Sequence, residues 1–123
     1  MLANCQIAAF VATANPDKAR DFYEKTLGLK LVADEEYAIV FDANGTTLRI
    51  QKVHEVAPIP YTALGWHVPD IEKMVAELSD RGVKFEIYEG IGQDERGIAT
   101  FPNGATVAWF KDPDGNLLSL DQY

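Results

Sequence analysis

The sequence predicts an α+β domain built from two copies of one β-α-β-β-β module. The chain of 123 residues has the length of a single domain. Its apolar residues alternate between strand-like and helix-like patterns, and the same order of elements occurs twice. We place the first module at about residues 6–53, a linker at about 54–61 and the second module at about 62–123.

The first module begins with an apolar strand and a capped helix. Ile7–Thr13 is short and rich in β-branched and aromatic residues, which is typical of a strand. Asn15 followed by Pro16 indicates a helix start, and Gly28 indicates a helix end. Between them, apolar residues at spacings of three to four predict a helix over Asp17–Leu27. The remaining strands of this module are expected at Leu29–Val32, Ala38–Phe41 and Thr47–Val53.

The second module repeats this order. Leu64–Val68 is strand-like, Pro69-Asp70 opens a helix and Gly82 ends it. The paired segments are Gly28-Leu29-Lys30-Leu31 with Gly82-Val83-Lys84-Phe85, and Asp42-Ala43-Asn44-Gly45 with Asp112-Pro113-Asp114-Gly115. The second copy carries an additional stretch, from about Glu89 to Gly104, which is glycine-rich and acidic. Such a long connection is a lid or binding loop, a partner surface or a flexible segment.

Composition and charge exclude several classes of partner. Eleven Lys and Arg against nineteen Asp and Glu give a net charge of −8, which disfavours binding to nucleic acid or to an anionic lipid surface. No apolar stretch approaches the roughly 20 residues that span a membrane. Cys5 is the single cysteine, which rules out an intrachain disulfide and fits a reducing compartment. We therefore expect a cytoplasmic protein with neither a nucleic-acid nor a membrane partner.

Two segments carry a resemblance to a known family. Ala19–Leu29 is similar to the first helix of the vicinal oxygen chelate (VOC) superfamily, and Trp109–Leu118 is similar to its closing hairpin. This superfamily includes glyoxalase I, bleomycin-resistance proteins and extradiol dioxygenases. The resemblance implies two curled sheets around a central cleft, with the helices outside, and a homodimer. In most members it also implies a divalent metal ion held by residues of the first and last strands of each module.

The positions that the resemblance assigns to the metal ligands do not carry ligands here. They fall on Ala8 and Arg49 in the first module, and on Ala63 and Ser119 in the second. Alanine has no donor atom, and the permanent positive charge of arginine repels a metal ion. We therefore expect no metal and no other cofactor. If this mapping is out of register, a metal-dependent enzyme of the superfamily is the alternative.

Strand alternation indicates which side chains line the cleft instead. The candidate ligand-binding residues are Phe10, Arg49, Gln51, His67, Trp109, Ser119 and Asp121. Arg49 is the strongest candidate because a guanidinium can hold a carboxylate or phosphate with two parallel hydrogen bonds. The alternative for Arg49 is an ion pair with Asp121 or a glutamate that only fills the cavity.

These observations favour a metal-independent protein that binds a small anionic or aromatic molecule. The first alternative is a metal-independent lyase or isomerase of a small oxo-acid, in which Arg49 holds the anion and His67 or Asp121 moves a proton. A third possibility is an interaction module with a filled cleft. The sequence shows no evident acid–base pair, so it favours binding over catalysis, assigns no catalytic residue and does not identify the ligand.

Overall fold

The computed structural model describes all 123 residues and contains two four-stranded sheets. Sheet A has the order β1-β4-β3-β2, and sheet B has the order β5-β8-β7-β6. The strands of sheet A are β1 (Ala8–Thr13), β2 (Lys30–Asp34), β3 (Ala38–Ala43) and β4 (Thr46–Lys52). Those of sheet B are β5 (Leu64–His67), β6 (Ala99–Thr100), β7 (Thr106–Lys111) and β8 (Leu117–Gln122). The helical segments are η1 (Leu2–Asn4), α1 (Pro16–Asp21), η2 (Phe22–Thr26) and α2 (Ile71–Asp80).

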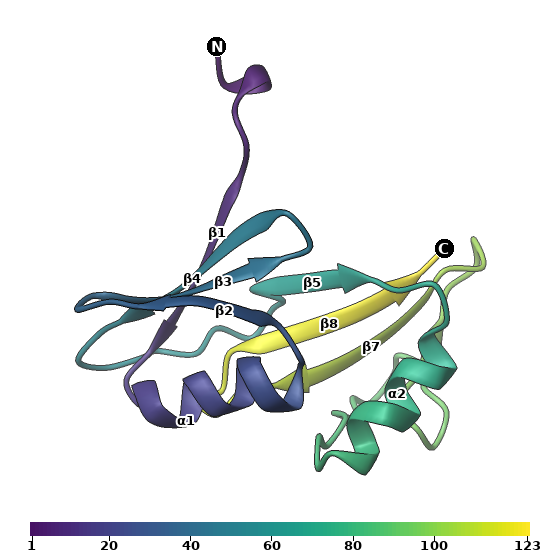
Figure 1. Cartoon of the computed structure of the whole chain (residues 1–123). Helices are drawn as coiled ribbons and strands as arrows, with labels where there is room; N and C mark the ends of the chain where they lie inside the picture. Colours follow the sequence, from purple (N-terminus) through teal and green to yellow (C-terminus); the bar gives the residue numbers. More distant parts are fainter.

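The two sheets share one topology, which confirms the predicted α+β fold of two similar modules. In each sheet the first strand of the module pairs in parallel with the last one, β1 with β4 and β5 with β8. The other pairings are antiparallel. Figure 1 shows α1 and α2 below the sheets, on the same side. The opposite faces of both sheets carry no helix, and we call them the helix-free faces.

The core lies between the helices and the sheets. It is one cluster of 18 buried residues, with contributions from both modules. On β4, Leu48 and Ile50 point into this cluster and are almost fully buried, as their alternation with polar neighbours predicts. Leu64 and Trp66 of β5 pack against the same cluster. Trp66 therefore lies on the core side of sheet B.

The first helix is shorter than the sequence pattern indicates, because its second half widens into a π-type turn. The Leu27 N–H donates to the carbonyl of Phe22, five residues earlier, at 2.9 Å. Within this turn the adjacent rings of Phe22 and Tyr23 pack edge to face with 5.3 Å between centroids. Gly28 then ends the helical segment at a φ of +75°, a conformation that glycine adopts without strain. None of the helices is long and apolar enough to cross a membrane.

The second module departs from the predicted repeat after α2. The segment that follows Gly82 forms no continuous strand, and only Phe85 bridges to Phe110 of β7. The outer strand of sheet B is β6, which lies inside the stretch that the sequence analysis treats as additional. The side chain of Gln93 explains this difference. It donates to the carbonyls of Glu86 and Gly97 and accepts from the Tyr88 N–H, so one side chain replaces backbone pairing.

The turn between β7 and β8 joins the two sheets. The Tyr23 hydroxyl donates to Asp112 Oδ2 at 2.7 Å, and the Thr13 hydroxyl donates to Asp114 Oδ2 at 2.6 Å. The Asn116 amide donates to the carbonyl of Ala12 at 2.8 Å. All three bonds connect the first module to one turn of the second, and they hold the two sheets in a defined arrangement.

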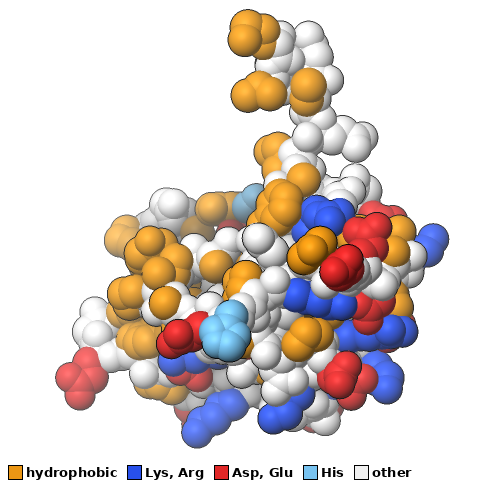
Figure 2. All heavy atoms as spheres, turned by 90° about the vertical axis from the view of Figure 1, so that its left-hand side faces the viewer, with side chains coloured by type: hydrophobic (Ala, Val, Ile, Leu, Met, Phe, Trp, Pro, Cys, Tyr) orange, Lys and Arg blue, Asp and Glu red, His pale blue; other side chains and the backbone are white.

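The N-terminal segment projects from the body of the molecule. Residues 1–7 are all exposed, and Figures 1 and 2 show the segment extending away from sheet A with hydrophobic side chains at its tip. Cys5 lies in this segment as an exposed free thiol.

Candidate functional site

Sheet A places three of the predicted site residues side by side on its helix-free face. Phe10 of β1 lies opposite Arg49 of β4 in the strand register, and Gln51 is two residues further along β4. Phe10 is 56% exposed, Arg49 is half-buried and Gln51 is exposed. The group therefore combines an aromatic ring, a guanidinium and an amide on an accessible surface.

Arg49 has an ion-pair partner on the neighbouring loop. Its Nη2 lies 3.3 Å from Glu35 Oε1. Both side chains are substantially exposed, and an ion pair of this kind contributes little to stability because water screens it. The pair engages one nitrogen of the guanidinium, and the Arg49 side chain makes no other hydrogen bond. The remaining donors are available to a ligand.

The adjoining charges form a small network below this loop. Lys52 Nζ lies 2.7 Å from Asp34 Oδ1, and Arg20 Nη1 lies 3.1 Å from Asp34 Oδ2. The Lys52 ammonium, with a smaller contribution from Arg20, holds the pKa of Asp34 below its usual value. The Asp34 carboxylate is therefore paired with two cations, whereas the side chains of Arg49 and Glu35 pair only with each other.

Sheet B brings together the other four predicted residues. Trp109 of β7 lies opposite Ser119 of β8, and His67 of β5 lies opposite Asp121 of β8. Gly65 makes room for this arrangement: a Cβ at this position would lie 2.6 Å from the Ser119 hydroxyl oxygen. Ser119 is consequently buried, although it lies on the helix-free face.

His67 and Asp121 form an acid–base pair that the sequence did not reveal. The imidazole Nδ1 is hydrogen-bonded to Asp121 Oδ1, while Nε2 has no partner within the chain. The carboxylate thereby fixes the orientation of the ring and leaves Nε2 for a ligand. The His67 side chain is 76% exposed, so the pair is open to solvent.

The structure thus assembles the predicted site as two groups, one on each sheet. No hydrogen bond or ion pair joins Phe10, Arg49 or Gln51 to the group on sheet B. Of the predicted residues, only His67 lines one of the four principal pockets. That both groups line a single cleft stays a prediction.

The residues at the positions that the resemblance assigns to metal ligands do not fit a divalent cation. Ala8 and Ala63 present methyl groups, Arg49 presents a cation engaged with Glu35, and Ser119 presents a single hydroxyl. Nowhere in the structure do three or more His, Cys, Asp or Glu side chains gather. Metal sites in proteins use such ligands in sets.

The long connection over residues 89–104 is held by hydrogen bonds within itself and by an ion pair to α2. The Asp94 carboxylate accepts from the N–H groups of Arg96 and Ile98, and Arg96 Nη1 lies 2.9 Å from Glu72 Oε1 on α2. Partial burial opposes ionisation of Asp94, but the hydrogen bonds from Ile98 and Arg96 outweigh it and lower the pKa of the carboxyl group. The stretch therefore carries strand β6 and contacts α2 through Arg96, and its role as a lid or binding loop, a partner surface or a flexible segment stays a prediction.

Sequence reasoning missed two features of this region. Glu35 lies in a turn at no diagnostic spacing from Arg49, so only the folded sheet reveals their contact. The role of Asp112 in binding Tyr23 was also missed. The sequence feature that could have indicated this role is the Asp-x-x-Gly turn that occurs in both modules. Asp42 accepts from the Gly45 N–H in its own turn, whereas Asp112 accepts from the Tyr23 hydroxyl of the other module.

Comparison with known proteins agrees with this architecture. Residues 6–120 match the model of the Glyoxalase/Bleomycin resistance protein/Dioxygenase superfamily. The chain therefore belongs to this superfamily, as the resemblance implied. No curated protein matches the sequence.

Solved structures share the fold at low sequence identity. A glyoxalase/bleomycin resistance protein/dioxygenase from Alicyclobacillus acidocaldarius is 22% identical with a TM-score of 0.74, over 98% of this chain and 92% of that one. A superfamily member from Sphaerobacter thermophilus is 25% identical with a TM-score of 0.72, over 95% and 97%. A lactoylglutathione lyase from Agrobacterium tumefaciens is 16% identical with a TM-score of 0.74, over 97% and 93%.

Proposed function

We propose that this protein binds a small anionic or aromatic molecule on its helix-free faces without a metal ion. The observation that carries the proposal is Arg49, a half-buried guanidinium beside the exposed ring of Phe10 at the position where the family places a metal ligand. A guanidinium and an adjacent aromatic ring suit a flat carboxylate, which forms charge-assisted hydrogen bonds with the cation and stacks on the ring.

The Arg49–Glu35 pair is compatible with ligand capture. Because the pair is partly exposed, the ligand carboxylate can replace Glu35 at small cost. A hydrogen bond to a charged group contributes about 1.5–3 kcal/mol, so loss of the guanidinium should weaken binding by roughly ten- to a hundredfold.

Benzoate is a suitable probe because it combines a carboxylate with a flat ring. Isothermal titration should detect benzoate binding to the wild type, and Arg49→Ala should reduce the affinity at least tenfold. Arg20→Ala removes the same charge from the helix side of sheet A and should leave the affinity unchanged, since Arg20 contacts only Glu24 and Asp34. Absence of benzoate binding, or equal affinities of the wild type and Arg49→Ala, would contradict the proposal. A more stable Arg49→Ala variant with unchanged binding would indicate a cavity-filling role.

The second candidate function is a metal-independent lyase or isomerase of a small oxo-acid. The His67–Asp121 hydrogen bond favours it, because a carboxylate-oriented imidazole is a suitable general base. In this reaction the free Nε2 of His67 takes a proton from the carbon next to the carbonyl group, and the resulting enolate is reprotonated or expels a leaving group. Arg49 holds the substrate carboxylate.

Proton exchange distinguishes catalysis from binding alone. With pyruvate in D2O, a general base should accelerate the replacement of the methyl protons by deuterium, which proton NMR detects. His67→Gln should abolish the acceleration, whereas His54→Gln changes an exposed histidine of the linker and should not. If the wild type does not accelerate the exchange, the catalytic function is refuted and only the binding function remains.

We further propose that the protein is a cytoplasmic homodimer. The single exposed cysteine supports a reducing compartment. The apolar side chains exposed on Val32 and Tyr37 support a second copy on sheet A. Sedimentation equilibrium tests the dimer, and a monomer at micromolar concentration would contradict it.

A further inference from the structure

The edge of sheet A formed by β1 lacks the features that keep strands of different molecules apart. In the strand order β1-β4-β3-β2, β1 has a neighbour on one side only. Its residues Ala8 and Phe10 are exposed, and no charged side chain or proline occurs in the sequence before Pro16. Figure 1 shows the segment before β1 continuing the line of the strand beyond sheet A, away from the other elements.

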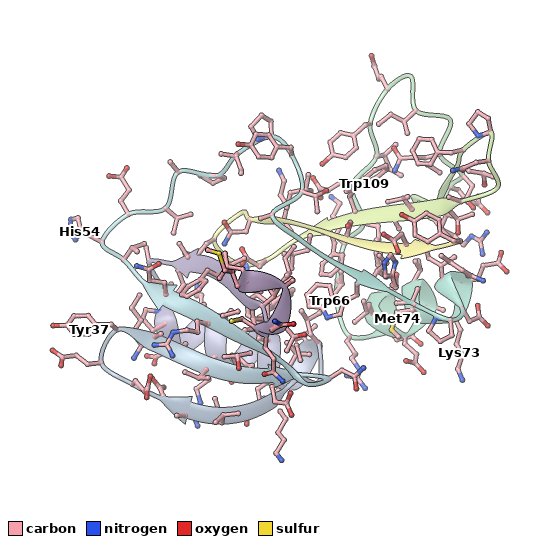
Figure 3. All side chains as sticks on the ribbon, turned by 90° about the horizontal axis from the view of Figure 1, so that it is seen from above. Tyr37, His54, Trp66, Lys73, Met74 and Trp109 are labelled. Carbon is pink, nitrogen blue, oxygen red and sulfur yellow. The ribbon has the colours of Figure 1, made fainter.

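The other three sheet edges carry protective features. The opposite edge of sheet A, β2, begins at Lys30, ends at Asp34 and contains a register shift. In sheet B, β6 is two residues long and β5 is four, and Figure 3 shows Trp66 of β5 beside Met74 of α2. Charges, irregular register and short length prevent an edge from pairing with another chain. Strand β1 is therefore the exposed edge without such protection.

The outward backbone groups of β1 are available over part of its length. The Thr13 carbonyl accepts from the N–H of the residue directly after β4, at 2.9 Å, so it points to the inner side of the strand. Because backbone groups alternate between the two sides of a strand, those of Ala8, Phe10 and Ala12 point outward. The Ala12 carbonyl accepts from the Asn116 amide, whereas no hydrogen bond from outside sheet A reaches Ala8 or Phe10.

From this open edge we propose that two copies of the chain pair antiparallel along β1 and the segment before it. The free edge runs from Cys5, where the backbone is extended at φ −110° and ψ 147°, to the residue before Ala12. Its middle residue is Ala8. A two-fold axis at this residue places Gln6 of each copy opposite Phe10 of the other, and these residues exchange backbone hydrogen bonds. The inference rests on the homodimer proposed above and names the segment that forms it.

Two properties favour a second copy over a strand of another protein. The same segment fits against itself around a two-fold axis, and it is uncharged in a chain whose net charge is −8, so the contact brings no like charges together. Pairing also places Ile7, which is 78% exposed, opposite Ala9 of the second copy and removes apolar surface from water. Only the backbone of Phe10 takes part, so its ring stays on the helix-free face for a ligand.

The single cysteine gives a direct test of the register. In this pairing Cys5 lies opposite Val11 of the second copy, six residues from the second Cys5. At about 3.4 Å per residue, nitroxide labels on the two cysteines should be about 20 Å apart, which double electron–electron resonance measures. The labelled protein should sediment like the unlabelled one, which controls for an effect of the label.

Substitutions at the axis test the pairing without a label. Ala8→Lys places two positive charges opposite each other and should weaken the dimer at least tenfold in sedimentation equilibrium. Ala76→Lys adds the same charge at an exposed position of α2 and should leave the dissociation constant unchanged. Ala8→Pro removes only an outward N–H, which an edge strand tolerates, and should weaken the dimer in the same way. All three variants should keep the circular dichroism spectrum of the wild type.

The outcomes separate this pairing from the homodimer itself. A monomeric wild type would contradict both. A dimer without the distance of about 20 Å, or one that Ala8→Lys and Ala8→Pro leave as stable as the wild type, would overturn the pairing along β1 and leave the homodimer standing on another surface. Benzoate binding at Arg49 is measured separately and does not depend on either result.

Discussion

Replacing Tyr23 with phenylalanine tests the connection between the two modules. Tyr23 is fully buried, and its hydroxyl donates to the buried carboxylate of Asp112 at 2.7 Å. A hydrogen bond to a charged group contributes about 1.5–3 kcal/mol. Because Asp112 Oδ2 keeps a second donor in the Asn116 amide at 2.9 Å, we expect a loss near the lower half of that range, about 2 kcal/mol.

Urea unfolding followed by circular dichroism measures this loss. For a domain of this size, about 2 kcal/mol corresponds to a decrease of roughly 8 °C in melting temperature. Tyr37→Phe is the matched control, because Tyr37 is 71% exposed and its hydroxyl makes no hydrogen bond, so its free energy of unfolding should stay within about 0.5 kcal/mol of the wild type. The reasoning is refuted if Tyr23→Phe is no less stable than Tyr37→Phe.

Three further predictions concern stability. Burial, reinforced by the charge of Asp112, raises the pKa of Tyr23 above its usual value, so the contribution of Tyr23 to the free energy of unfolding is complete below about pH 10 and decreases above it. Tyr23→Phe should therefore make the loss of stability between pH 9 and 11.5 less steep. Equal steepness in the two proteins would contradict this. Gly97 and Gly82 both have a φ of +93°, but only at Gly97 would an added Cβ approach another residue, the Cβ of Phe85 at 3.1 Å. Urea unfolding should show that Gly97→Ala loses about 1 kcal/mol more stability than Gly82→Ala. Equal losses would argue against close packing of Gly97 on Phe85. Gln93→Leu removes three hydrogen bonds and should accelerate amide hydrogen exchange in β6, which NMR detects. Unchanged exchange would show that the Gln93 side chain does not hold this strand.

The repeat of elements was readable from the sequence because each module carries its own local signals. Pro16 and Asp70 mark helix starts, and Gly28 and Gly82 mark helix ends, where the structure gives both glycines a positive φ. Strand alternation likewise predicted that Leu48 and Ile50 point to the core and that Arg49 points away. These features follow from residues close in the sequence.

The departures depend on contacts between distant or irregular segments. The π-type turn at Phe22 leaves the apolar spacing of a helix almost unchanged, so periodicity alone does not reveal it. Strand β6 is two residues long and depends on the Gln93 side chain, which has no signature in the pattern. The pairing of His67 with Asp121 requires β5 and β8 to be adjacent in parallel, which only the folded sheet establishes.

The proposed function requires that this member of the superfamily binds its small-molecule ligand through Arg49 in place of a metal ion. Elemental analysis of the purified protein, together with thermal unfolding in the presence and absence of Ni²⁺, Zn²⁺, Mn²⁺ and Fe²⁺, tests it most directly. We expect no stoichiometric metal and no change in melting temperature with any of these ions. About one tightly bound metal ion per chain, with a metal-dependent rise in melting temperature, would contradict the assignment of Ala8, Arg49, Ala63 and Ser119.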